Sequence, residues 1–263
     1  MILCAGEALI DMIPRQTAQG GTAFAPLAGG SVFNTAIALG RLGTPVQFFS
    51  GLSSDLFGDV LRKELTASKV DSSPAHISDR PTTLAFVTLT DGHASYAFYD
   101  ENTAGRMIGQ ADLPVVQADA IFFGGISLVV EPCAAAYQAL MLREAKTCVT
   151  MIDPNIRPGF ITDEAAYRAR LADMFKAQGV TVLTRDGAAE VPAVKATVVD
   201  TVGAGDTFSA GFLADLHKAG LLTKSTLPTA TMHDLTRAAG FGARVAAITV
   251  ARAGANPPWA AEL

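Results

Sequence analysis

Short β-rich runs alternate with alanine-rich runs of helical length, and this alternation constrains the fold more than any other feature of the chain. Continuous apolar strands separated by helices are typical of a parallel sheet that is covered on both faces. The sequence therefore predicts an α/β fold, a doubly wound, mostly parallel sheet with helices on both faces. In such a sheet, ligands bind beyond the carboxyl ends of the strands. Expected strands are 2–10, 46–50, 120–123, 148–152 and 180–184, and expected helices are 33–42, 60–68, 134–145, 164–177, 207–219 and 235–247.

The composition suits one large domain, residues 1–263, because 49% of the residues are hydrophobic and only 17% are charged. The net charge of −5, without a dense Lys/Arg cluster, argues against a nucleic-acid partner. No apolar run approaches the roughly 20 residues of a membrane span, and the N-terminus lacks signal-peptide features. Cys4, Cys133 and Cys148 match neither a zinc spacing nor a disulfide framework. We therefore expect no membrane partner, reduced thiols and a cytoplasmic location.

One segment breaks the alternation. Residues 83–99 read TLAFVTLTDGHASYAFY, which is two alternating strands around Asp91-Gly92, a favoured hairpin turn pair. A hairpin inserted in an α/β chain is expected to stand apart from the main sheet. The sequence predicts a small β lid formed from about 14–28 and 81–103, and the alternative is a hairpin that only decorates a sheet edge.

Residues 200–212, DTVGAGDTFSAGF, predict an anion-binding turn at a helix start. Backbone N–H groups at such a start are unpaired and carry the positive end of the helix dipole. Gly203, Ala204 and Gly205 would let an anion approach these amides closely. Asp206 could then take a proton from a hydroxyl that attacks a phosphate. The alternative is that Asp206 is an ordinary helix N-cap, and no Walker A loop or G-x-G-x-x-G fingerprint is present.

A second glycine cluster, residues 28–34 (AGGSVFN), precedes the helix TAIALGRLG. Gly29 and Gly30 allow the backbone to come close to a ligand, and Asn34 can both donate to and accept from a hydroxyl. Asp11 follows an apolar strand, where its carboxylate could accept hydrogen bonds from a polyol. Together the two clusters predict a site for a hydroxyl-rich substrate beside an anion.

These stretches resemble the ribokinase-like (PfkB) family of carbohydrate kinases over nearly the whole chain. AGGSVFNTAIALGRLG is similar to its first signature, and DTVGAGDTFSAGF closely matches its second. GEALIDMI, DPNIRPG and ITVARAGANPP are similar to its bacterial fructokinase branch. The resemblance implies a ribokinase-like fold, ATP and Mg²⁺ as cofactors, and transfer of a phosphoryl group to a sugar.

The resemblance also implies residue roles. Asp206 falls on the catalytic base, and Gly203, Ala204 and Gly205 on the anion hole. Asp200 falls where the family often builds a monovalent-cation site, for which K⁺ is the expected ion. The implied sugar contacts are Asp11, Gly29, Gly30, Asn34 and Arg157, and the implied nucleotide contacts are Thr184, Arg185, Gly187, Gly203 and Gly205. Arg157 could contact substrate or phosphate, or could instead pair with a surface carboxylate.

The substrate is expected to be a neutral hexose. Related 2-keto-3-deoxygluconate kinases commonly offer an arginine at the end of the lid, where this chain has Asp100 and Glu101. Two carboxylates would repel an acidic sugar, so D-fructose, phosphorylated at its 6-hydroxyl, is favoured. Tyr99 could pack over the sugar ring or belong to the lid core. The alternatives are a 2-keto-3-deoxygluconate, ribose or nucleoside kinase and, from another class, a non-catalytic sugar sensor; lid pairing would permit a homodimer.

The chain departs from the family after the helix that is expected to end near residue 176. Relatives continue with another strand, an N-x-x-E element that organises Mg²⁺ through water, and a further helix. Here the chain runs directly into VTVLT, no asparagine has a glutamate three positions later, and a β-hairpin before VPAV is missing. We hypothesise that segments near 175–179 and 187–190 are absent from this sequence. If the chain is truly this short, nucleotide and metal binding are in question.

Overall fold

The computed structural model describes residues 1–90, 93–178 and 194–263. A parallel four-stranded sheet in the order β10-β9-β1-β4 forms its centre. The order is not consecutive, so the chain crosses over between neighbouring strands, as the alternation of strands and helices predicts. The strands are β1 (Ile2–Ala5), β4 (Val46–Phe49), β9 (Ala120–Gly124) and β10 (Val149–Asp153).

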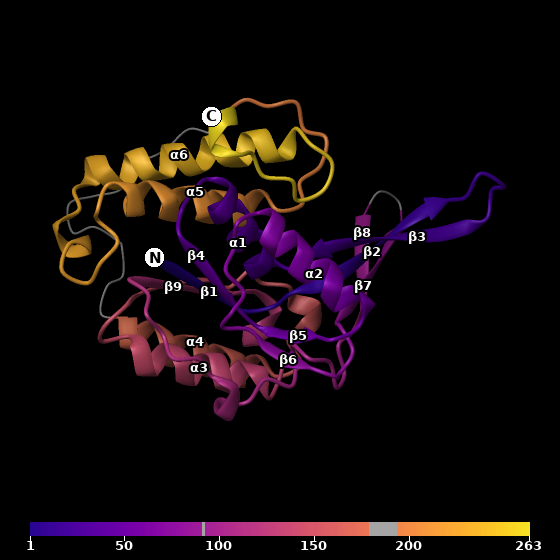
Figure 1. Ribbon diagram of the computed structural model, residues 1–263, viewed down its shortest axis with the longest axis horizontal. Coiled ribbons are helices and arrows are strands. Elements are labelled where there is room, and N and C mark those ends of the chain that lie inside the picture. The colour runs from indigo at the N-terminus through magenta and orange to yellow at the C-terminus, as the bar shows by residue number, and fades with distance from the viewer. Residues whose placement is uncertain (91–92, 179–193) are drawn as a thin grey trace.

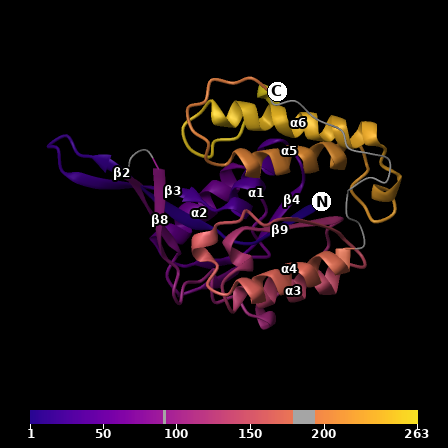
Figure 2. The same cartoon turned by 180° about the vertical axis from the view of Figure 1, so that it is seen from behind.

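Helices cover both faces of this sheet, which confirms the predicted fold class. In Figure 1, α5 and α6 lie above the sheet with α1 beneath them, and α3 and α4 lie below it; Figure 2 shows the same layers from behind. The helices are α1 (Ser31–Arg41), α2 (Leu56–Ala67), α3 (Cys133–Glu144), α4 (Glu164–Gln178), α5 (Ala204–Lys218) and α6 (Met232–Val250).

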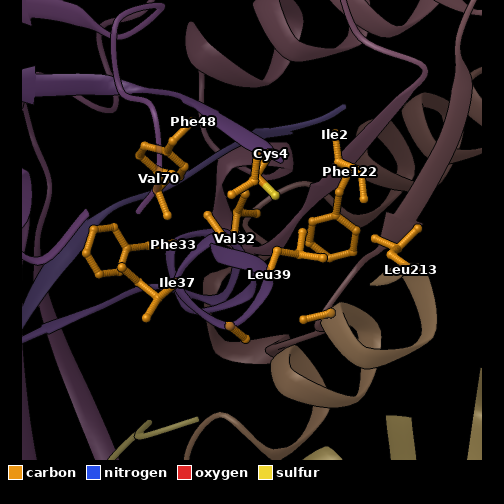
Figure 3. Packing of buried hydrophobic residues seen from close by; sticks show 14 of the residues in the cluster. Ile2, Cys4, Val32, Phe33, Ile37, Leu39, Phe48, Val70, Phe122 and Leu213 are labelled. Atoms are coloured by element: carbon orange, nitrogen blue, oxygen red, sulfur yellow. The ribbon is translucent and has the colours of Figure 1, made fainter. Parts of the chain in front are cut away.

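The buried side chains form two cores because successive strand residues point to opposite faces of the sheet. Ile2 and Cys4 of β1 face the layer of α1 and α5, where they pack near Leu213 (Figure 3). Leu3 and Ala5 face the layer of α3 and α4. The central strands β1 and β9 are apolar along their whole length for this reason, as expected for strands that are buried on both sides.

A second sheet forms the lid, in the order β3-β2-β7-β8. The expected strand 2–10 is two strands, because the chain leaves the main sheet after Ala5 and enters the lid at Leu9. The lid therefore begins earlier than the 14–28 segment predicted. Its strands are β2 (Leu9–Gln16), β3 (Thr22–Gly29), β7 (Leu84–Thr90) and β8 (His93–Tyr99), and a separate pair is β5 (Gly51–Ser53) and β6 (His76–Ser78).

Short 3₁₀ turns connect several of these elements. The turn η2 matters for the site because it follows β9 directly. The expected strand 180–184 lies outside the described residues. The five turns are η1 (Gln110–Asp112), η2 (Gly125–Leu128), η3 (Pro158–Phe160), η4 (Leu227–Thr229) and η5 (Ala260–Glu262).

Helices α5 and α6 pack closely through glycines. A Cβ atom added at Gly211 would lie 2.7 Å from the Cα atom of Gly242, and one added at Gly242 would lie 2.6 Å from the carbonyl oxygen of Phe208. Such distances are too short for a side chain, so the helices approach at these points only because the residues are glycine. This contact fixes the helix whose first turn carries Asp206.

We predict that Gly242→Ala lowers the free energy of unfolding by about 1–3 kcal/mol, because the new methyl group overpacks the helix contact. Gly240 in the same helix is the matched control, since a Cβ atom there meets no atom within 4 Å. Gly240→Ala should raise stability by about 0.5–1 kcal/mol, because glycine is unfavourable inside a helix. Urea unfolding of both variants measures the difference; equal effects would contradict the proposed packing.

Candidate active site

A cavity of about 440 Å³ opens where the carboxyl ends of the main-sheet strands meet the lid. This is the position at which open α/β sheets bind ligands. Segments far apart in the sequence line it: the turns after β1, β9 and β10, the first turns of α1 and α5, and lid strands β2 and β8. The lining residues are Glu7, Leu9, Asp11, Gly30, Ser31, Asn34, Tyr96, Phe98, Gly125, Ile126, Asp153, Asn155, Arg157, Phe160 and 201–206.

Asp206 lies in the wall of this cavity. It is the third residue of α5, whose N-cap is Gly203, so the alternative that Asp206 is the cap is wrong. Its side chain reaches α1 and the turn after β10. Oδ1 accepts a hydrogen bond from Ser31 Oγ at 2.7 Å and from Asn155 Nδ2 at 3.3 Å, and Oδ2 accepts one from Asn34 Nδ2 at 3.0 Å.

Burial raises the pKa of Asp206 to about 6, and the negative charge of Asp153 contributes to the rise. The hydrogen bonds from Asn34 and Ser31 act in the opposite direction, because they stabilise the ionised carboxylate. At neutral pH, Asp206 is therefore ionised and is a stronger base than an ordinary aspartate. A general base works best when its pKa lies near the operating pH.

The first turn of α5 presents free amides beside this carboxylate. Gly203 has a left-handed φ of 78°, which favours glycine. Within the described part of the chain, no backbone carbonyl accepts from the amides of Gly205 and Asp206. We expected the amide of Ala204 to be free for an anion as well, but it donates to the Thr201 carbonyl oxygen at 3.3 Å. The available anion donors are thus centred on Gly205 and Asp206.

The surroundings of Gly205 indicate a ligand. A Cβ atom added at this position would meet no protein atom within 4 Å, and its backbone does not have a positive φ. The fold itself therefore does not require glycine here, and the residue lines the cavity. A missing side chain at a helix start leaves room for a bound group to reach the amides.

We predict that Gly205→Ala reduces kcat by about 100-fold, because the methyl group would occupy the space through which an anion reaches the amides of Gly205 and Asp206. Its thermal stability should not fall, since the methyl group enters open space. Steady-state kinetics and a thermal melt of the same preparation measure the two effects, with Gly240→Ala as the matched control. Full activity of Gly205→Ala would show that no group binds closely at this turn.

On the lid side, Asp11 of β2 lies in the cavity wall. Burial, with a smaller contribution from the charge of Asp206, raises the pKa of Asp11 to about 6. Gly29 was expected to touch the sugar, but it is not among the lining residues. A Cβ atom at Gly29 would lie 2.2 Å from Asp11 Oδ2, so this glycine makes room for the carboxylate. Gly30 and Asn34 line the cavity as expected.

Tyr99 does not lie in the cavity, which corrects the expectation that it packs over the sugar. It pairs with Leu84 in the lid sheet, on the face opposite to Asp11, and is 63% exposed. Tyr96 and Phe98 take the inner face of β8 instead and line the cavity. The alternation of side chains along a strand predicts that Tyr96 and Phe98 share one face and that Tyr99 lies on the other. The sequence alone does not say which of these faces points inward.

Arg157 lines the cavity, and no carboxylate pairs with it among the residues that the structure describes. Its Nη1 donates to the carbonyl oxygen of Ile156 at 3.2 Å. Sequence reasoning missed its neighbours Asp153 and Asn155, which reach the same cavity from the end of β10. The signal for them was present, since DPNIRPG directly follows a buried strand.

Asp200 lies beside the cavity rather than in it. Its Oδ1 accepts from the Val202 amide at 3.0 Å and its Oδ2 from the Gly254 amide at 2.9 Å, so it ties two loops together. The three expected nucleotide contacts Thr184, Arg185 and Gly187 lie outside the described residues.

Comparison with known proteins agrees with this geometry. The sequence profile of the pfkB family of carbohydrate kinases matches residues 1–177 and 176–262, and the chain belongs to this family. A fructokinase from Rhizobium leguminosarum bv. trifolii is 48% identical over 85% of this chain and 82% of its own length. The structure of a fructokinase with bound ATP from Xylella fastidiosa is similar with a TM-score of 0.81 at 26% identity, covering 97% of this chain and 93% of that one.

The same comparisons bear on the departure from the family. The profile matches in two parts that meet at residues 176–177, next to the first segment that we hypothesise to be absent. The alignment with the Rhizobium protein has 267 positions, but it includes only 85% of the 263 residues of this chain. That relative therefore has residues with no counterpart here. The junction near 187–190 lies outside the described residues.

No helix in the described parts of the chain is both long enough and apolar enough to cross a membrane.

Proposed function

We propose that this chain phosphorylates the 6-hydroxyl of D-fructose with ATP, as a single ribokinase-like domain with a β lid. The observation that carries the proposal is the Asp206 carboxylate, which lies in a cavity beside the free amides of its own helix start. Phosphoryl transfer needs an oriented nucleophile, a base for its proton, and donors for the charge on the transferred group. The first turn of α5 supplies the last two.

In this mechanism, the sugar lies between the lid and the first turn of α1. Asn34 and Asp11 hold its hydroxyl groups, and Tyr96 covers it from the lid. The 6-hydroxyl donates to Asp206, which takes its proton as the hydroxyl oxygen attacks the γ-phosphorus of ATP. The bond between that phosphorus and the β,γ-bridging oxygen breaks, and ADP leaves. The amides of Gly205 and Asp206 stabilise the charge that develops on the phosphoryl oxygens. A lid that closes over the sugar excludes water and limits hydrolysis of ATP.

The charge of the cavity supports a neutral substrate. The carboxylates of Asp11, Asp153 and Asp206 and the carboxyl group of Glu7 line it, against the single guanidinium of Arg157. Asp100 and Glu101 do not provide the repulsion expected from the sequence, because neither residue lines this cavity and Asp100 pairs with Arg106 at 3.1 Å. Repulsion of an acidic sugar therefore comes from the cavity wall itself.

The expected cations fit the residues present. Among residues 1–90, 93–178 and 194–263, no three His, Cys, Asp or Glu side chains gather into a metal site. Mg²⁺ commonly binds through one or two carboxylates together with substrate phosphates, and Asp153, which lines the same cavity, supplies such a carboxylate. When bound, it would neutralise phosphate charge. Asp200 keeps lone pairs beyond its two hydrogen bonds, so a K⁺ ion beside it also fits.

A non-catalytic sugar sensor is the second candidate. The observation in its favour is the stretch of relatives that has no counterpart near residues 176–177. This stretch falls between the sugar half of the chain and the anion-binding turn. A sensor would bind fructose and gain thermal stability without forming ADP.

We predict that D-fructose gives the highest kcat/KM in a coupled ADP-release assay with fructose, ribose, 2-keto-3-deoxygluconate and a nucleoside. Activity should rise with pH through about 6, because Asp206 must be ionised to accept a proton. Asp206→Asn should lower kcat by about 100- to 10,000-fold, with the fructose Kd changed little in calorimetry. Near-normal kcat of this variant would eliminate the proposed base.

The stability of Asp206→Asn serves as its folding control. The pKa of Asp206 is higher in the folded chain than in the unfolded one, so the folded state holds the proton more tightly. Its ionisation therefore lowers the free energy of unfolding as pH rises from about 4 to about 6. Asparagine does not titrate in this range, so the free energy of unfolding of the variant should not fall between about pH 4 and pH 6 as that of the wild type does.

We also propose a cytoplasmic enzyme that forms a homodimer through the lid. Three free, buried cysteines suit a reducing compartment. The outer face of the lid carries an aromatic row, in which the Phe24 and Phe86 rings are 5.0 Å apart and the Phe86 and Tyr99 rings 5.4 Å. Aromatic side chains exposed together on one face are typical of protein interfaces.

A double variant tests this dimer. Phe24→Ser with Tyr99→Ser should convert a dimer into a monomer in light scattering, because both side chains lie on the outer lid face. Val115→Ser is the control, since Val115 is the most exposed large hydrophobic residue described and lies outside the lid, at 89%. A wild-type monomer, or a dimer that survives the double substitution, contradicts the proposed interface.

A further inference from the structure

Glu7 is a buried carboxyl group to which the proposed reaction assigns no task. It lies in the turn between β1 and β2 and is 9% exposed. One side of it faces the sugar cavity, and the other faces a second cavity of about 20 Å³ beside Ser127 and Cys133. Glu7 thus forms part of the wall between the active site and a pocket about the size of a water molecule.

Two segments meet at its side chain. Glu7 Oε1 accepts from the backbone amide of Ser31 at 2.9 Å, which is the first amide of α1. The N-cap of α1 is Gly30, whose lack of a side chain leaves this helix without a local cap. Glu7 therefore performs a capping role from a distant part of the sequence.

On its other side, Glu7 Oε2 lies 3.0 Å from Ser127 Oγ and 3.5 Å from the Ser127 amide. Gly125 admits the carboxyl group, because a Cβ atom there would lie within 2 Å of Glu7 Oε1 (1.9 Å), and its φ of 68° favours glycine. The carboxyl group thus connects α1 to the turn η2 after β9.

The hydrogen-bond distances at Ser127 favour the protonated form of Glu7. Ser127 Oγ is 2.7 Å from the Gly124 carbonyl oxygen and 3.0 Å from Glu7 Oε2. A hydroxyl has one proton to donate, and the carbonyl oxygen is the nearer acceptor and cannot itself donate. The contact with Glu7 is then completed when Glu7 carries the proton and Ser127 Oγ accepts.

We propose that Glu7 is a positioning residue that acts in its neutral, protonated form, donating to Ser127 Oγ while it accepts from the Ser31 amide. The inference rests on the proposed role of Asp206. Ser31 Oγ donates to Asp206 Oδ1 at 2.7 Å, so the position of α1 that Glu7 fixes is also the position of a donor to the base. Proton transfer between Glu7 and the substrate is no part of this role.

The charges around Glu7 favour the neutral form. Burial raises its pKa to about 7, and the charge of Asp206 adds to the rise, although hydrogen bonds to the ionised form, first from the backbone amide of Glu7 itself and then from Ser127, oppose it. Cys133 and Tyr137 of α3 also face it, and both are buried and uncharged at neutral pH. Arg106 lines the small cavity but is paired with Asp100. As pH rises through 7, ionised Glu7 would add a second negative charge near the base and the phosphate.

The test compares Glu7→Ala, Glu7→Gln and the control Glu101→Gln, an exposed lid residue. Glutamine offers both the oxygen for the Ser31 amide and a donor for Ser127 Oγ, so it imitates protonated Glu7. We expect Glu7→Ala to lose about tenfold or more in kcat and Glu7→Gln to restore most of that loss. Wild type and Glu101→Gln should lose kcat above about pH 7, whereas Glu7→Gln should not.

A measurement that does not depend on turnover tests the protonation state of Glu7 separately from the kinase proposal. In ¹³C NMR of protein labelled at glutamate side chains, one carboxyl resonance should titrate near pH 7 and vanish in Glu7→Gln. Titration of that resonance near the ordinary value of about 4.3 overturns the inference, even if Glu7→Ala does not fold. A Glu7→Gln variant as inactive as Glu7→Ala also overturns it. Absence of sugar phosphorylation by the wild type counts against the kinase, while the NMR result still decides the state of Glu7.

Discussion

The rest of the site depends on how the Asp206 carboxylate is held. Three donors from two other elements converge on it, Ser31 and Asn34 from α1 and Asn155 from the turn after β10. A buried carboxylate without such partners would be strongly destabilising. The donors therefore allow an ionised base in a protein interior, and they also connect the two helices and the sheet edge that enclose the cavity.

Burial raises the pKa of Asp206, whereas its hydrogen bonds lower it, and the balance of the two effects sets its strength as a base. Burial alone would keep Asp206 protonated, whereas full solvation would leave it a weak base. The result is a pKa of about 6 for both Asp206 and Asp11, each raised chiefly by burial. The same negative surroundings disfavour an anionic sugar, so one electrostatic arrangement bears on both catalysis and the choice of substrate.

The glycine residues shape the site because they have no side chain to fill the space beside them. Gly29 leaves space for the carboxylate of Asp11 and Gly125 for that of Glu7, while Gly205 faces a cavity that no protein atom fills. The sequence showed glycine clusters but could not distinguish these purposes. At Gly29 and Gly125 the protein itself occupies the space, and at Gly205 the space is open to the cavity.

The sequence by itself determined the α/β class and the glycine-rich helix start before Asp206, because the period of the apolar residues and the run GAGD are local properties of the chain. It did not show that the strand expected at 2–10 divides at Ala5, nor that Tyr96 rather than Tyr99 faces the cavity. Those features depend on which strands pair with one another and in which register, because a shift of one residue exchanges the faces of a strand. Only the tertiary structure brought Glu7 to the start of α1. The contact joins Glu7 and Ser31, which are far apart in the sequence and which the folded sheet places side by side.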